Sequence, residues 1–240
     1  MKCSKYSLCL FFLFVFSGNL FTQVKSGKIV YERRTNLYKK FKDDNVKEWI
    51  EKDDKNKVDI FELYFNDSLS VFKPQYSDLK EKMSWTTSKN MVYQDLNSNQ
   101  RLSIKSIWGE QFYLLDTVYK RKWKITESKR SICGYTCRKA ILEMNDTTRI
   151  YAWFAEDIIP SVGPESFCNL PGAILGLATE DGGVIYFAKT IEILNPDLII
   201  LQPKKNRSKI YSSKELKEQL QKDFGKNPWG KAMIKETFFW

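Results

Sequence analysis

The chain of 240 residues contains no histidine. This absence excludes Ser-His-Asp and Cys-His catalytic machinery, and it excludes any metal site built on imidazole. The side chain used most often in general acid–base catalysis is missing as well. Any catalysis would therefore rest on Asp, Glu, Cys or Tyr alone. The composition disfavours an enzyme, and we assign no catalytic residue.

Cysteine is scarce, and only three of the five cysteines lie beyond the first 22 residues. These disulfide candidates are Cys133, Cys137 and Cys168, and their odd number allows at most one internal disulfide. Cys133 and Cys137 are four positions apart in a segment patterned as a strand, which separates them by roughly 13 Å. Bridged Cα atoms lie within about 7 Å, so this pair needs a bend at Gly134-Tyr135. Pairing of either one with Cys168 is equally open. Three cysteines without histidine do not complete a structural zinc site, so we expect no metal.

Long hydrophobic runs are absent except at the start of the chain. Residues 8–16 are almost entirely apolar, follow Lys2 and Lys5, and are followed by small residues. The run has about half of the roughly 20 residues that a membrane-spanning helix needs. This pattern is typical of a secretory signal peptide, which we place at 1–22. Residues 23–240 are then expected to form a single exported domain.

Basic residues outnumber acidic ones, with 39 Lys and Arg against 29 Asp and Glu, a formal charge of +10. Lys2 and Lys5 leave with the signal peptide, so 37 against 29 gives the mature chain +8. The basic residues are spread along the chain, and export argues against nucleic acid as a partner. A solvated basic surface explains the charge most simply. Attraction to anionic lipid or lipopolysaccharide is the functional alternative.

Short segments in which apolar and polar residues alternate dominate the mature chain, as in half-buried strands. They are residues 29–34, 58–65, 69–72, 91–96, 101–108, 111–115, 122–126, 135–144, 147–155, 174–178, 184–193 and 198–201. Turn-forming residues separate neighbouring segments, as in Asn66-Asp67-Ser68, Asn145-Asp146 and residues 180–183. The spacing predicts a mainly β (α+β) fold, an antiparallel meander with one face buried.

One helix is well marked near the end of the chain. Ser212 and Glu215 form a capping box, and Gly225 is a plausible stop signal. One apolar stripe runs along this helix through Leu216, Leu220 and Phe224. The charged segment 40–57 is either a short helix or a solvated loop. We therefore expect a curved antiparallel sheet or half-barrel meander with one C-terminal amphipathic helix packed on it.

Residues 131–193 carry the most specific pattern. Gly-Tyr-Thr-Cys-Arg-Lys-Ala at 134–140 is followed by Ala-Trp-Phe at 152–154, by Gly163-Pro164, and by Asn-Leu-Pro-Gly-Ala-Ile at 169–174. In this order the motifs resemble the GLPGLI family, exported proteins mostly of Bacteroidota. The candidate binding residues are those of the family motif, namely Gly163, Pro164, Asn169, Leu170, Pro171, Gly172 and Ile174.

The motif departs from the family pattern at two positions. Asn169 stands in place of the first glycine of the run, and Ala173 in place of its second leucine. Asn tolerates a positive φ better than most residues that carry a side chain, so the turn is expected to persist. Proline and glycine together make a rigid, shaped loop. That loop either plugs one end of the sheet or forms the lip of a binding groove, and it contains no catalytic or metal-ligating constellation.

The resemblance implies work at the cell envelope, because genes of the family often lie near those of outer-membrane receptors. It carries no established activity and no cofactor. We therefore expect an exported periplasmic or outer-membrane-associated protein that binds an apolar ligand, such as a lipid, or a peptide without catalysis. The alternative is an interaction subunit of an outer-membrane receptor, transporter or other envelope complex. That reading needs an exposed aromatic patch, for which Pro228-Trp229 and residues 238–240 are candidates.

Overall fold

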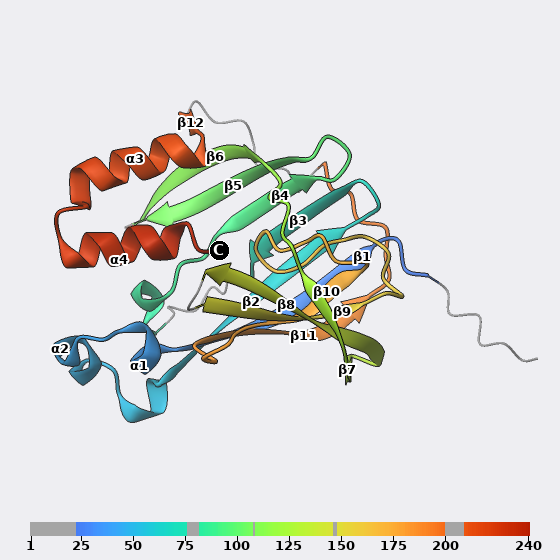
Figure 1. Cartoon of the computed structure of the whole chain (residues 1–240), viewed down its shortest axis with the longest axis horizontal. Helices are drawn as coiled ribbons and strands as arrows, with labels where there is room; N and C mark the ends of the chain where they lie inside the picture. The colour runs from blue at the N-terminus through green and yellow to red at the C-terminus, as the bar shows by residue number, and fades with distance from the viewer. Residues whose placement is uncertain (1–22, 76–81, 108, 146–147, 200–208) are drawn as a thin grey trace, which may run out of the picture.

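A computed structural model describes residues 23–75, 82–107, 109–145, 148–199 and 209–240. The predicted signal peptide at 1–22 lies outside the described residues. The described strands form one large, open and curved sheet (Figure 1). All neighbouring strands are antiparallel except β12, which runs parallel to β6. The predicted mainly β fold with a curved antiparallel sheet is confirmed.

Strand order follows chain order closely. Across the sheet the strands are β12 (Ile210–Tyr211), β6 (Glu110–Thr117), β5 (Gln100–Ile107), β4 (Met91–Asp95), β3 (Leu69–Pro74), β2 (Asn56–Phe65), β1 (Gly27–Asn36), β11 (Val184–Glu192), β10 (Ala173–Thr179), β9 (Thr148–Ala155), β8 (Tyr135–Asn145) and β7 (Lys124–Ile132). Two meanders, β1 to β6 and β7 to β11, join where β1 pairs with β11. The first strand of the first meander and the last strand of the second therefore lie side by side at the centre of the sheet.

The alternation seen in the sequence is the alternation of burial in the strands. In β1 every second side chain is fully buried and the residues between are half-exposed or exposed. The predicted turn between β2 and β3 forms because the Asn66 side-chain oxygen accepts hydrogen bonds from the amides of Ser68, at 2.9 Å, and Leu69, at 2.7 Å. Local turn chemistry and strand periodicity therefore agree in this hairpin.

Two strand predictions need correction. Residues 198–199, the described part of the predicted strand 198–201, form a turn in which the Asp197 carboxylate accepts from the Ile199 amide at 3.1 Å. β7 continues to Ile132, whereas the prediction ended at residue 126. β7 is an edge strand with almost all of its side chains exposed or half-exposed, so apolar alternation does not mark it.

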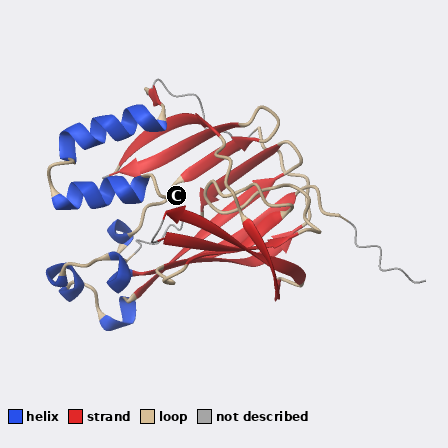
Figure 2. Ribbon diagram, in the orientation of Figure 1, coloured by secondary structure: helices blue, strands red, loops and turns tan. Residues whose placement is uncertain are grey.

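The helices gather at one end of the sheet (Figure 2). α3 (Ser213–Phe224) begins at the predicted capping box and buries Leu216 and Leu220 in a cluster with side chains of β5, β6 and α4. The expected C-terminal amphipathic helix is confirmed, and a second helix that the sequence analysis did not mark, α4 (Pro228–Thr237), follows it and packs on α3. Gly230 allows this close approach, since a Cβ there would lie 2.1 Å from the Phe224 carbonyl oxygen.

The charged segment before β2 contains short helical turns. They are α1 (Leu37–Lys40), α2 (Asp44–Glu48) and the 3-10 turn η1 (Lys52–Asp54), and a similar turn, η2 (Ser84–Thr86), precedes β4. Both α1 and α2 start at a side-chain cap, from Asn36 and Asp43. Among the described residues, no helix is both long and apolar enough to cross a membrane.

The family-like motif forms a loop that joins β9 to β10 and is buried over most of its length. The Tyr31 hydroxyl of β1 donates to the Ile174 carbonyl at 2.6 Å, and the Trp123 indole donates to the Cys168 carbonyl at 2.9 Å. Asn169 adopts φ +70°, as expected for a residue that replaces glycine in this turn. Gly172, at φ +140°, is sterically required, because a Cβ there would lie 2.1 Å from the Ala155 carbonyl oxygen.

Candidate functional site

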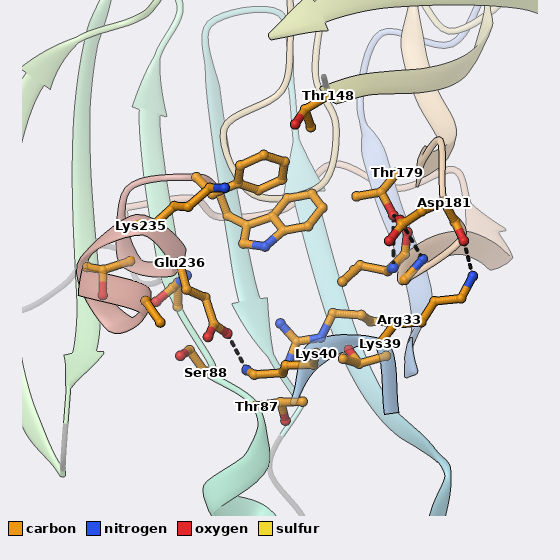
Figure 3. A pocket seen from close by; sticks show the side chains of 18 of the residues that line it. Arg33, Lys39, Lys40, Thr87, Ser88, Thr148, Thr179, Asp181, Lys235 and Glu236 are labelled. Atoms are coloured by element: carbon orange, nitrogen blue, oxygen red, sulfur yellow. Dashed lines mark hydrogen bonds and ion pairs between the residues drawn. The ribbon is translucent and has the colours of Figure 1, made fainter. Parts of the chain in front are cut away.

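A cavity of about 530 Å³ lies at the end of the sheet near the helices (Figure 3). Residues of β1, α1, β5, β9, α4 and the turn between β10 and β11 line it. Its wall carries six basic and three acidic side chains, a formal surplus of three positive charges. The six basic residues are Arg33, Lys39, Lys40, Lys105, Arg149 and Lys235.

The three acidic side chains of the wall already have partners within the protein. They are Glu180 with Arg149 and Tyr151, Asp181 with Thr179 and Gly183, and Glu236 with Lys40. Burial alone would raise the pKa of Asp181, but hydrogen bonds from Thr179 and Gly183 outweigh it and lower that pKa. The Lys235 side chain, by contrast, has no hydrogen bond or ion pair with any residue that the structure describes. The cavity can therefore offer positive charge to a bound group.

A buried ionic network adjoins the cavity, and two of its members, Arg33 and Asn90, line the cavity wall. Arg33 donates to the Asp59 carboxylate at 2.7 Å and 3.2 Å, and its guanidinium lies 3.8 Å from Glu165. Glu165 also accepts from the Tyr186 hydroxyl at 2.8 Å and from the Asn90 amide at 3.3 Å. Each of these five residues is at most 5% exposed. The motif loop therefore contributes one carboxylate to a network otherwise held by the sheet and the segment before β4.

Burial and interactions with neighbouring groups shift the pKa values of the residues in this network. Burial acts to lower the pKa of Arg33, but the neighbouring Tyr186, Asp59 and Glu165 outweigh it and raise that pKa. Burial acts to raise the pKa of Asp59, whereas the charge of Arg33 and its hydrogen bonds lower it. Burial raises the pKa of Tyr186 well above its usual value, with a further contribution from Glu165. Arg33 and Asp59 thus remain ionised and Tyr186 remains neutral at physiological pH.

Lys105 of β5 is another buried basic residue of the cavity wall. Its ammonium group donates at 2.8 Å to a main-chain oxygen of Trp240, the last residue of the sequence. Burial lowers its pKa to about 8, with Glu165 acting in the opposite direction. A bound anion near Lys105 would favour the charged form of its side chain.

Phe239 and Trp240 form an aromatic wall beside these charges. Trp240 lies edge-on to Phe167 at 5.9 Å, Tyr186 at 5.7 Å and Phe239 at 4.9 Å between ring centroids. Residues 238–240 therefore pack inward, which corrects their expected place in an exposed aromatic patch. Trp229, the other candidate, is 54% exposed and contacts Phe224.

The predicted motif residues build the loop rather than the charged cavity. Gly163, Pro164, Leu170, Gly172 and Ile174 are buried, whereas Asn169 and Pro171 are exposed. A Cβ on Gly163 would lie 2.8 Å from the Phe167 carbonyl oxygen, so this position requires glycine. Asn169 accepts from the Arg121 amide at 3.1 Å and lines a separate cavity of about 590 Å³. Four further residues of the same loop line this cavity together with Asn169, namely Ile159, Pro160, Ser161 and Cys168.

The three cysteine candidates are free thiols. Cys133 is exposed in the turn between β7 and β8, where it adopts φ +51° before Gly134 at φ +83°. Cys137 and Cys168 are buried, and burial raises the pKa of Cys137 to about 12. The chain bends at Gly134 as a disulfide would need, yet no pair is bonded. No cluster of acidic or cysteine side chains suited to a metal ion occurs in the described part of the chain.

The residues that shape the charged cavity were not singled out from the sequence. Arg33 occupies a position that the alternation of β1 assigns to the buried face, and Glu165 follows directly after Gly163-Pro164. Lys105 is likewise buried within β5. A charged residue at a position expected to be buried was the signal, because such a residue requires a partner or a ligand.

Comparisons with known proteins show a likeness of fold and assign neither a family nor an activity. No family model and no curated protein matches the chain. A structure of PNGF-II in space group P21 matches with a TM-score of 0.58 at 15% identity, over 83% of this chain and 34% of that one. Its C2 crystal form gives 0.53 at 16% identity, over 78% and 31%. An uncharacterised conserved protein from Thermus thermophilus gives 0.40 at 6% identity, over 77% and 90%. The chain thus spans about a third of the length of PNGF-II, and the likeness is one of fold.

Proposed function

We propose that the protein is an exported, non-enzymatic binding protein of the cell envelope whose basic cavity takes a small ligand with a negative charge. The observation that carries this proposal is the set of six basic side chains around one cavity of about 530 Å³. Three of the six are already ion-paired within the protein, so the charge open to a ligand comes from Lys39, Lys105 and Lys235. Small-molecule sites typically have volumes of about 300–1,000 Å³.

The charge of the cavity narrows the ligand class expected from the sequence. An apolar ligand or a peptide was expected, and the aromatic wall of Phe239 and Trp240 still offers an apolar surface. The buried Lys105 and the exposed Lys235 favour a carboxylate, sulfonate or phosphate on the same molecule. Export and the family assignment rest on residues 1–22 and on the motif, respectively.

Titration with benzoate and with its neutral counterpart benzamide tests the proposal, with binding followed by ligand-observed NMR. We expect benzoate to bind at least tenfold more tightly than benzamide. Lys235→Glu should weaken benzoate binding about two- to fivefold, the usual range for one exposed charge. Lys222→Glu on α3 makes the same charge change outside the cavity and should have no effect. Equal binding of the two probes would overturn the proposal.

A further inference from the structure

A second cavity, of about 640 Å³, adjoins the basic one. Six residues line both cavities: Lys40, Thr87, Ser88, Ser106, Glu236 and Thr237. The second cavity has fewer charged side chains than the first, and large apolar side chains from β4, β5, α4 and the segments around α1 and η2 line it. These are Phe41, Trp85, Met91, Ile104, Ile107 and Met233.

The apolar cavity presents an aromatic surface to solvent. Trp85 is 60% exposed, and its ring lies 5.6 Å from that of Phe41 at an interplanar angle of 43°. An exposed tryptophan inside a concave, mostly apolar site offers surface that a ligand can remove from water. Burial of apolar surface releases about 25 cal/mol per Å², so even partial cover of Trp85 favours binding.

The Lys40–Glu236 ion pair lies at the boundary between the two cavities. It joins α1 to α4, and both residues line both cavities. The side chains are 19% and 40% exposed, so the pair is partly solvated. Partly exposed ion pairs contribute little to stability, so this contact can rearrange around a ligand at little cost.

We infer that the two cavities form one groove for an anionic amphiphile with a straight apolar chain. The anionic head lies near Lys105 and Lys235, and the apolar chain passes the Lys40–Glu236 pair and lies against Trp85. The first cavity complements the charge of such a ligand, the second offers apolar side chains to its chain, and the two cavities share a wall. This inference rests on the proposed function, because it assigns the head group to the same basic cavity.

A chain-length series tests the inference on the full mature chain. The probes are the linear carboxylates from butanoate to dodecanoate, kept below their micelle concentrations, and the linear alcohols of the same lengths. We expect affinity for the carboxylates to rise about three- to fourfold per added methylene, which corresponds to about 0.8 kcal/mol for each buried CH₂. The affinity should stop rising once the alkyl chain is longer than the groove. Each alcohol should bind less tightly than the carboxylate of equal length.

Two matched variants test where the alkyl chain of the ligand lies. Trp85→Ala should weaken dodecanoate binding about tenfold while leaving butanoate binding unchanged. Trp49→Ala removes a tryptophan that is 79% exposed and lines neither cavity, and it should change neither affinity. Both tryptophans are exposed, so neither substitution empties the core.

The outcomes separate the inference from the proposed function. Carboxylates that bind with no dependence on chain length would overturn the amphiphile groove and leave the anion site in place. A length dependence that survives intact in Trp85→Ala would also overturn the groove, because the chain would lie elsewhere. Alcohols and carboxylates that bind equally well at every length would overturn the proposed anion site itself.

Discussion

The Tyr186 hydroxyl donates a hydrogen bond of 2.8 Å to Glu165, which fastens the motif loop to β11 at the centre of the sheet. Both side chains are buried, at 0% and 1% exposure. Glu165 reaches this position with φ +55°, a conformation that residues other than glycine rarely adopt. The loop accepts this backbone cost, of order 1–3 kcal/mol, in exchange for contacts with Tyr186, Asn90 and Arg33.

Removal of the Glu165 carboxylate is expected to destabilise the folded protein. The loss of stability should grow with the number of buried donors that are left without an acceptor. Glu165→Ala deprives Tyr186, Asn90 and Arg33 of a buried acceptor and should cost about 3–5 kcal/mol. Glu165→Gln keeps an acceptor for Tyr186 and should cost less, about 1–3 kcal/mol. The free energy of unfolding from urea titrations measures both. Glu156→Gln, at an exposed position, is the control, and equal stability of the Ala and Gln variants would contradict the network.

Gly172 and Gly134 form a matched pair for backbone strain. Both have positive φ, at +140° and +83°, but a Cβ on Gly172 would meet the Ala155 carbonyl oxygen at 2.1 Å whereas one on Gly134 would meet nothing within 4 Å. Gly134→Ala should therefore cost about 1 kcal/mol, from conformation alone. Gly172→Ala should cost several times as much or prevent folding. Thermal melts of the two variants compare them, and similar melting temperatures would refute the steric argument.

Lys105 should make folding stability depend on pH in the alkaline range. Burial lowers its pKa from 10.5 to about 8, so between these values the unfolded chain binds a proton that the folded protein does not. Stability from this group therefore rises as pH increases through that window, by up to about 3 kcal/mol. Lys105→Met should lack this rise. The measurement is the difference in the free energy of unfolding between wild type and variant at pH 7, 8, 9 and 10, and a constant difference would exclude the shift.

Anion binding should show the opposite dependence on pH. A bound carboxylate favours the charged form of Lys105, so affinity for benzoate should fall as pH rises above about 8. Linkage limits the slope to about one logarithmic unit per pH unit for a single proton. Lys105→Met should bind benzoate more weakly at pH 7 and show no such fall. A wild-type affinity that stays constant from pH 7 to 10 would place the anion away from Lys105.

The cysteines should differ in reactivity. Cys133 is exposed, whereas Cys137 and Cys168 are 0% and 3% exposed. In a chain that lacks residues 1–22, a thiol reagent such as iodoacetamide should therefore modify Cys133 alone in the native state. All three should react in urea without a reductant. Peptide mass spectrometry assigns the sites, and a single reactive thiol in urea would reveal a disulfide and contradict the free thiols.

Local sequence signals specified much of the fold. Alternation predicted β1 and β2, Asn66 predicted the turn after β2, and Ser212 with Glu215 predicted the start of α3. These signals succeed because each depends on neighbours within a few positions. β7 and α4 were missed or shortened because an exposed edge strand and a helix held by packing on α3 carry weaker local signals.

The sequence by itself determined the absence of imidazole chemistry, the strand periodicity and a rigid loop built from proline and glycine. Only the tertiary structure decided that Arg33, Lys105 and Glu165 meet beneath one cavity, since they come from β1, β5 and the motif loop. The physical reason is that a buried charge is paired by whatever the fold brings opposite to it. Periodicity shows which side chains point inward, and sheet order and curvature decide which of them face one another.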